Sequence, residues 1–145
     1  MKIYHWLFWV GLLLYVVAFA LPAIFAPDSP ALPGYRCALF VTVEQPWTPE
    51  NRTLLHVQPL RYIPMMMTGW INPLFLVTAI LILLRKAATL VGILRIIVLL
   101  LIPLCWVVFH YETVHPREGH FLWILGMLLV LFSAKLRPSE AKAQR

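Results

Sequence analysis

Apolar positions in this chain occur in long runs, unlike the alternating or one-sided patterns of strands and helices in soluble proteins. A helix needs about 20 mostly apolar residues to cross a hydrocarbon core of about 30 Å. Four runs meet or approach that length. We therefore predict four membrane-spanning helices, over residues 3–26, 64–84, 89–110 and 119–136.

Polar and proline-rich stretches mark the ends of these runs. The first is followed by the sequence PDSPALPG (27–34), and the second stops at Arg85 and Lys86. Arg95 lies within the third run, where its charge has to reach the headgroups or mark the true start of the helix. The fourth run is short, so it needs polar residues that reach both interfaces, or a locally thinned bilayer.

Composition supports the same class of protein. Hydrophobic residues make up 61% and charged residues 12% of the chain, against roughly 45–50% and about 25% in soluble domains. The twelve Lys and Arg residues are scattered, which excludes a basic face for nucleic acid. We therefore expect an all-α integral membrane protein in which residues 1–145 form one membrane domain.

The distribution of charge predicts the orientation, because short loops rich in Lys and Arg stay in the cytoplasm. With both termini cytoplasmic, eight of the twelve Lys and Arg residues fall inside, and five of the six Asp and Glu residues fall outside. This arrangement puts loops 27–63 and 111–118 outside and the basic tail, 137–145, inside.

The long outer loop, 27–63, contains two segments with strand character. Cys37–Val43 is apolar and β-branched, Thr53–Val57 can return as its partner, and turn-forming residues separate them. We predict a small β-hairpin between the first two spans. An isolated hairpin is marginally stable in water, so it should lean on the helices or on another protein.

The second outer loop carries the richest polar cluster, HYETVHPREGH (110–120). Imidazole and carboxylate groups together suit zinc, and the candidate ligands are His110, Glu112, His115, Glu118 and His120. Their spacing matches no compact metal-binding pattern, and a turn between two membrane helices has to be hydrophilic in any case. A solvated loop is the favoured interpretation, with a zinc or copper site as the alternative.

Other cofactors find less support. Haem needs axial histidines at one depth, and only His110 and His120 share a depth, near the surface. A quinone pocket fits better, although no residues locate it. The run Met65 to Met67 invites Cu(I), yet consecutive side chains point about 100° apart on a helix, which favours packing. Cys37 and Cys105 are expected to be free thiols at different depths.

The most distinctive sequence within a predicted span is Trp70-Ile71-Asn72-Pro73. Pro73 lacks an N–H and frees a carbonyl near residue 69, which Gly69 and the Asn72 side chain should accommodate at a kink. A buried amide should also bond a neighbouring helix. Pro103 should kink the third span at a similar depth, which predicts a cavity between these two helices; a ligand-gripping break of the transporter type is the alternative.

The predicted spans hold no Asp or Glu, and no nucleophile elbow, metalloprotease or phosphate-binding motif occurs. Ion-driven transport and catalysis are therefore not indicated. Three glycines, Gly11, Gly92 and Gly126, offer small surfaces where another copy of the chain could approach closely.

Three stretches carry a resemblance: LPA (21–23), GWINPLFL (69–76) and EGHFLWILGMLLVLFSA (118–134). Together with the layout, they resemble small four-span bacterial inner-membrane proteins of unassigned function. The resemblance implies a four-helix fold and a bacterial inner membrane, and it brings no activity, cofactor or site residue.

Two functions follow as expectations. The first is a non-enzymatic accessory or assembly subunit, including a toxin-immunity role, that binds another membrane protein or a second copy of itself within the bilayer. The alternative is a protein that binds a metal or cofactor through the outer His/Glu loop and handles metal, electrons or protons.

Overall fold

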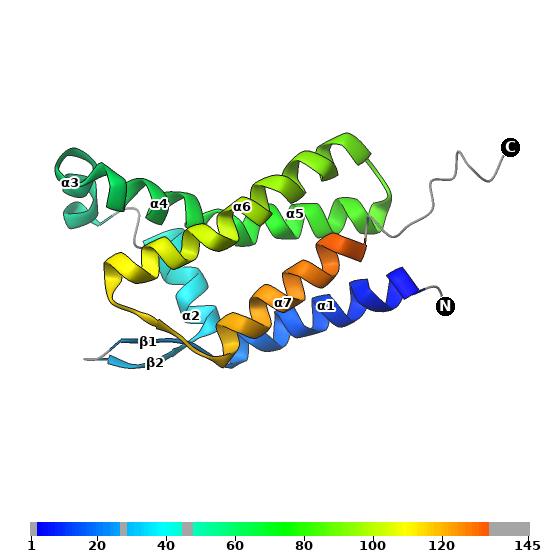
Figure 1. Cartoon of the computed structure of the whole chain (residues 1–145), viewed down its shortest axis with the longest axis horizontal. Coiled ribbons are helices and arrows are strands. Elements are labelled where there is room, and N and C mark those ends of the chain that lie inside the picture. Colours follow the sequence, from blue (N-terminus) through cyan, green and yellow to red (C-terminus); the bar gives the residue numbers. More distant parts are fainter. Residues whose placement is uncertain (1–2, 27–28, 45–47, 134–145) are drawn as a thin grey trace, which may run out of the picture.

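The computed structural model describes residues 3–26, 29–44 and 48–133. Most of them are helical (Figure 1). The tail 137–145 and the end of the predicted fourth span, 134–136, lie outside the described residues. The helices are α1 (Ile3–Ala20), α2 (Gly34–Leu39), a π-helical turn η1 (Phe40–Glu44), α3 (Pro49–Val57), α4 (Pro59–Gly69), α5 (Ile71–Leu84), α6 (Ala88–Glu112) and α7 (Glu118–Ser133), and the strands are β1 (Pro22–Ala26), β2 (Ser29–Pro33) and β3 (His115–Pro116).

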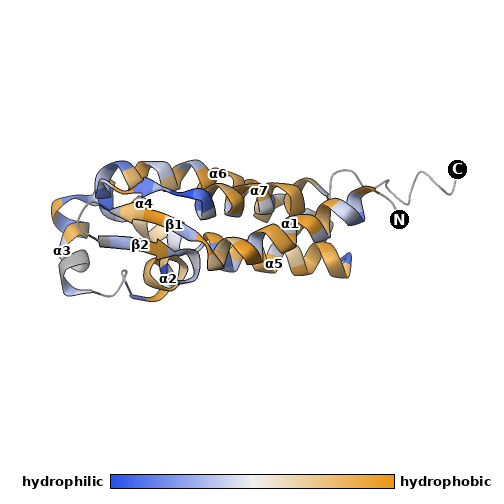
Figure 2. Cartoon of the chain, turned by 90° about the horizontal axis from the view of Figure 1, so that it is seen from below, coloured by the Kyte–Doolittle hydropathy of each residue, from blue (hydrophilic) through white to orange (hydrophobic). Residues whose placement is uncertain are grey.

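Three helical segments are long and apolar enough to cross a membrane. They are α1 with 18 residues, the stretch Pro59–Leu84 formed by α4 and α5 with 26, and α6 with 25. The fourth apolar helix, α7, has 16 residues. Figure 2 shows hydrophobic ribbon along α1, α5, α6 and α7, and hydrophilic residues concentrated at the end that carries α3 and the strands. The distribution of apolar helices is therefore compatible with a membrane protein.

The first helix pairs with the last. A Cβ added at Gly126 would lie 2.6 Å from the backbone N of Tyr15 and 2.7 Å from the carbonyl O of Gly11. The two backbones therefore touch at this crossing, as small residues allow in membrane helices. Of the three glycines that offer small surfaces for a close approach, Gly11 and Gly126 are used within one chain, and at Gly92 an added Cβ would meet no atom within 4 Å.

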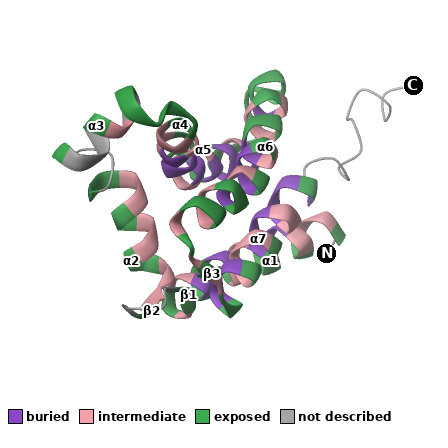
Figure 3. Ribbon diagram, turned by 60° about the vertical axis from the view of Figure 1, so that its left-hand side comes forward, coloured by how far each residue is buried: buried purple, intermediate pink, exposed green. Residues whose placement is uncertain are grey.

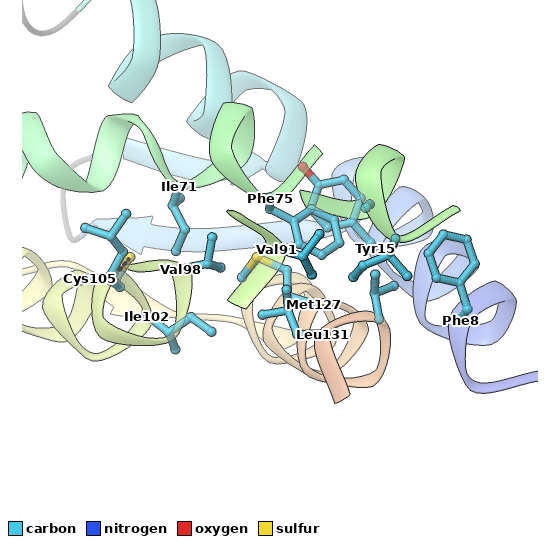
Figure 4. Close-up of a cluster of buried hydrophobic side chains, with 14 residues drawn as sticks. Phe8, Tyr15, Ile71, Phe75, Val91, Val98, Ile102, Cys105, Met127 and Leu131 are labelled. Atoms are coloured by element: carbon cyan, nitrogen blue, oxygen red, sulfur yellow. Dashed lines mark hydrogen bonds between the residues drawn. The ribbon is translucent and has the colours of Figure 1, made fainter. Parts of the chain in front are cut away.

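The main apolar core draws side chains from α1, α5, α6 and α7 (Figure 4). Phe75, Val98 and Met127 are fully buried and come from three of these helices. The ring of Tyr15 lies 4.5 Å from that of Phe75, between centroids, which joins α1 to α5. The inner surfaces of the helices are buried in Figure 3, while the outer surfaces are exposed, as expected for helices that face lipid.

The predicted hairpin is wrong in its position. Cys37–Val43 lies in α2 and η1, and Thr53–Val57 lies in α3. The sheet forms instead from β1 and β2, which pair antiparallel with Ile24 opposite Leu32, and β3 adds to the free edge of β1. None of the residues Cys37–Val43 is buried, and Leu39, Phe40 and Val43 are exposed, so the segment is helical despite its strand propensity, which context readily overrides.

Proline explains where the sheet is found. Pro22 disfavours helical backbone at Leu21, so α1 ends at Ala20 and not at Ala26 as we predicted. Prolines at 22, 30 and 33 then favour the extended backbone of β1 and β2. The hydrogen bond from Gly34 N to Leu21 O (2.9 Å) and that from Arg117 N to Ala23 O (2.8 Å) hold the hairpin across the ends of α1 and α7.

The contact between α1 and α7 yields a direct test. We expect Gly126→Ala to lower the free energy of unfolding by about 1–3 kcal/mol, because the added methyl group meets backbone and the helices must separate. Reversible unfolding in mixed micelles measures the change. The matched control is Gly92→Ala, which should be neutral or stabilising by up to about 1 kcal/mol; equal losses in both variants would contradict the close crossing.

Candidate functional site

The break between α4 and α5 lies at Trp70, next to the Asn72-Pro73 pair. Pro73 cannot donate to the carbonyl of Gly69, four residues earlier. The hydroxyl of Thr42, in η1, donates to that carbonyl at 2.9 Å. We expected Asn72 to accommodate the freed carbonyl, but a side chain from the outer segment does so. Thr42 was missed because nothing in its local sequence connects it with residue 69.

Asn72 instead bonds two other helices. Its Oδ1 accepts a hydrogen bond from the Tyr15 hydroxyl at 3.0 Å and another from Trp123 Nε1 at 2.9 Å. The interhelical bonds expected for this amide are thus present, and they tie α5 to both α1 and α7. Tyr15 and Trp123 have no distinguishing sequence signal, since aromatic residues are frequent in all four apolar runs.

The five candidate metal ligands do not come together. His110 and His115 are exposed, as is Glu118, which pairs with Arg117 at 3.3 Å. The Glu112 carboxylate accepts two hydrogen bonds from the Arg61 guanidinium, both 2.8 Å long. Only His120 is buried. Within the described part of the chain, no three His, Cys, Asp or Glu side chains are grouped as a metal ion requires.

The two prolines act differently on their helices. Pro73 follows the break between α4 and α5, whereas α6 runs continuously through Pro103. The methionine run points in several directions, with Met65 buried and Met67 half exposed, which agrees with packing roles.

A cavity of about 110 Å³ lies where these features meet. It is open on one side and is lined by residues of α1, α7, α4, α5, α6, β1, α2 and η1. We expected a cavity between the second and third spans; the one present lies beside Asn72 but is lined by α1, α2 and α7 as well, and Pro103 is not among its lining residues. The residues that line it are Ala18, Phe19, Ala23, Ile24, Gly34, Cys37, Ala38, Val41, Thr42, Thr68, Ile71, Asn72, Cys105, Val108, Phe109, Gly119, His120 and Trp123.

His120 is the most unusual of these lining groups. It is 6% exposed, and its Nε2 atom is buried with no hydrogen-bond partner among the described residues. Its ring packs against aromatic neighbours, with centroids 4.8 Å from Phe109 and 5.3 Å from Trp123. Buried polar groups are nearly always paired, so an orphaned imidazole nitrogen at a cavity indicates a site that a ligand or water completes.

Both cysteines line the same cavity as free thiols, Cys37 from α2 and Cys105 from α6. Figure 4 shows Cys105 beside Ile71 at one end of the buried cluster. Burial raises the pKa of the Cys37 thiol to about 11, so it is largely protonated at neutral pH and reacts slowly. No Asp, Glu, Lys or Arg is among the described lining residues, so the cavity favours a neutral, mainly apolar occupant.

No family model, curated protein or solved structure matches this chain significantly. The architecture of the described residues therefore defines the class of protein. They form a mostly helical fold with three helices long and apolar enough to cross a membrane, a fourth apolar helix, and a small sheet at one end.

The pair of bonds on Asn72 can be tested by a double-mutant cycle. We expect Asn72→Leu to lower the free energy of unfolding by about 1–2 kcal/mol, because the Tyr15 and Trp123 donors lose their acceptor. Trp123→Phe should cost less when Leu already occupies position 72. Strictly additive losses, measured by reversible unfolding in mixed micelles, would contradict the shared hydrogen bond.

Proposed function

We propose that the chain is a non-enzymatic, four-span subunit of the bacterial inner membrane, and that its outer end binds another membrane protein in an accessory or assembly role. The fourth span in this proposal is α7. It packs antiparallel along α1 through Gly11 and Gly126, so it shares the depth of a helix that is long enough to cross. Its described part, Glu118–Ser133, is about 24 Å long, a length that a locally thinned bilayer accommodates.

The proposed orientation rests on the two ends of the α5–α6 hairpin. Arg85, Lys86 and Arg95 line one groove at its turn, which agrees with the rule that Lys and Arg gather on the cytoplasmic side. At the opposite end, Arg61 pairs with Glu112, so that end has no excess of positive charge. Both termini are then cytoplasmic.

The observation that carries the partner-binding role is an apolar patch at the outer end. We define the outer patch as Val57, Leu60 and Ile63, whose exposed fractions are 73%, 76% and 48%. Val57 and Leu60 precede Arg61 as the chain runs toward the membrane, so they lie beyond the charged pair. Figure 3 shows this part of α3 and α4 exposed. The segment Pro59–Leu84 has 26 residues, or about 39 Å, which is longer than a hydrocarbon core of about 30 Å, so its first turn extends beyond the core, where exposed apolar side chains typically mark a contact surface.

The proposed occupant is a different protein embedded in the same membrane. The outer patch is continuous with the helix that enters the bilayer through α5, so a partner that reaches it from the membrane can cover both surfaces. The partner's segment outside the membrane would place apolar side chains against the outer patch, beside the Arg61–Glu112 pair.

Orientation can be tested by thiol labelling of intact cells. With Cys37 and Cys105 replaced by Ala, we expect Gln58→Cys to react with a membrane-impermeant maleimide and Thr89→Cys to react only after permeabilisation, because both positions are exposed at opposite ends of the bundle. The reverse pattern, or equal labelling of the two positions, would overturn the proposed N-in, C-in topology.

Partner binding can be tested by site-specific photocrosslinking in cells. A benzophenone amino acid at position 60 should give a discrete adduct with one other membrane protein, whereas the same group at position 100 should not, since Leu100 is 67% exposed on the proposed lipid-facing side of α6.

The adduct should depend on the rest of the outer patch. Val57→Ser combined with Ile63→Ser should reduce its yield about tenfold, the effect of roughly 1.4 kcal/mol of lost binding. An adduct of twice the mass of the chain would show self-association instead, and no adduct at positions 57, 60 and 63 would refute partner binding by this surface.

A further inference from the structure

The cavity at the outer end of the helices is separate from the outer patch, and what it binds does not depend on the partner. Its lining combines apolar and aromatic side chains with one imidazole nitrogen that lacks a partner. Such a combination is typical of small-molecule sites, which are mostly apolar and contain a few polar groups that fix orientation.

Size limits the occupant to one ring or a short chain. An apolar cavity of roughly 150 Å³ holds a molecule the size of benzene, and this cavity measures about 110 Å³ but is open on one side, so a substituted ring enters it in part and extends through the opening. Drug-sized ligands need about 300 Å³ or more. A longer molecule would therefore place only its head in the cavity, with the remainder outside.

Charge and geometry define the chemistry of that head. The described lining has no charged side chain, so an ionised group would be desolvated without compensation. The aromatic rings around His120 suit a flat ring. The Nε2 atom of a neutral imidazole either donates to a carbonyl or accepts from a hydroxyl, so an oxygen on that ring would complete its hydrogen bonding.

The same geometry disfavours the other occupants of a histidine site. Asn72 Oδ1 already accepts two hydrogen bonds, so this amide can offer a ligand only its N–H donors, whereas Nε2 of His120 is a buried lining atom without a partner among the described residues. A metal ion needs several ligands, and the described residues provide no such group of three. Water could bond the nitrogen, but it would leave most of the apolar surface uncovered.

We propose that the cavity binds the head ring of a neutral, lipid-soluble ring ketone of the quinone class, with a ring oxygen hydrogen-bonded to Nε2 of His120. The ring packs among Phe109, Trp123 and Ile71, and Cys37 lines the outer wall. Binding alone is proposed, and no electron or proton transfer is involved.

Protection of Cys37 provides the measurement. In a Cys105→Ala chain, Cys37 is the remaining thiol of the two in the sequence, and a small uncharged maleimide should label it in detergent. We expect duroquinone, a fully substituted benzoquinone, to slow labelling saturably. Durene, the benzene ring with the same four methyl groups and no oxygen, should require a concentration about 3–10 times higher, the effect of one net hydrogen bond.

Variants then test the role of His120. His120→Phe keeps an aromatic ring but removes the nitrogen, so the duroquinone concentration for half-protection should rise about 3–10-fold, while that for durene stays unchanged. The matched control, His110→Phe, alters an exposed histidine and should leave both values unchanged. Unfolding in mixed micelles verifies that each variant is folded.

Three results would overturn the proposal: no saturable protection by duroquinone, equal protection by the two probes in the otherwise unmodified Cys105→Ala chain, or an unchanged duroquinone value in folded His120→Phe. The comparison of the two probes uses a chain in which His120 is intact, so it tests the proposal even if His120→Phe fails to fold. None of these results bears on crosslinking at the outer patch, so the two proposals fail independently.

Discussion

The hydrogen bonds on the Asn72 side chain join the two halves of this molecule. One half is the α1–α7 pair, and the other is the α4–α5 segment with α6. In hydrocarbon, an unpaired amide, phenol or indole N–H is costly to bury. Asn72, Tyr15 and Trp123 remove that cost for one another, and they do so at one relative position of the three helices. Apolar contacts elsewhere in the core are less directional, so this cluster specifies the register between the halves.

The helix break beside Asn72 also connects the core to η1 and α2. Pro73 leaves the Gly69 carbonyl without its helical donor, and Thr42 supplies one from η1. This bond holds η1, and with it α2, against the helices at the outer end. The cavity exists because these segments cover the space between the two halves while the aromatic side chains around His120 fill only part of it.

Charged side chains at the end of the bundle that carries the sheet form ion pairs. The Arg61–Glu112 pair joins α4 to α6 through two short hydrogen bonds, and Arg117 neighbours Glu118. Glu112 and Glu118, two of the metal ligands that the sequence suggested, thus have cationic partners. The side chain of His120 is buried. The end of the bundle that carries the sheet consequently has an exposed apolar patch on α3 and α4. Apart from it lies the cavity, where Nε2 of His120 has no partner among the described residues.

The sequence by itself predicted a mostly helical protein with several helices apolar enough to cross a membrane, because in a bilayer long apolar runs need helices whose backbone groups bond internally. It also identified the apolar helices to within a few residues at most ends, the break at Pro73 and the interhelical role of Asn72, since each follows from local chemistry. Only the tertiary structure decided which residues meet. The position of the sheet, the Thr42 bond to Gly69, the burial of His120 and the pairing of Glu112 with Arg61 depend on contacts between segments far apart in the chain, and no local pattern encodes such distances.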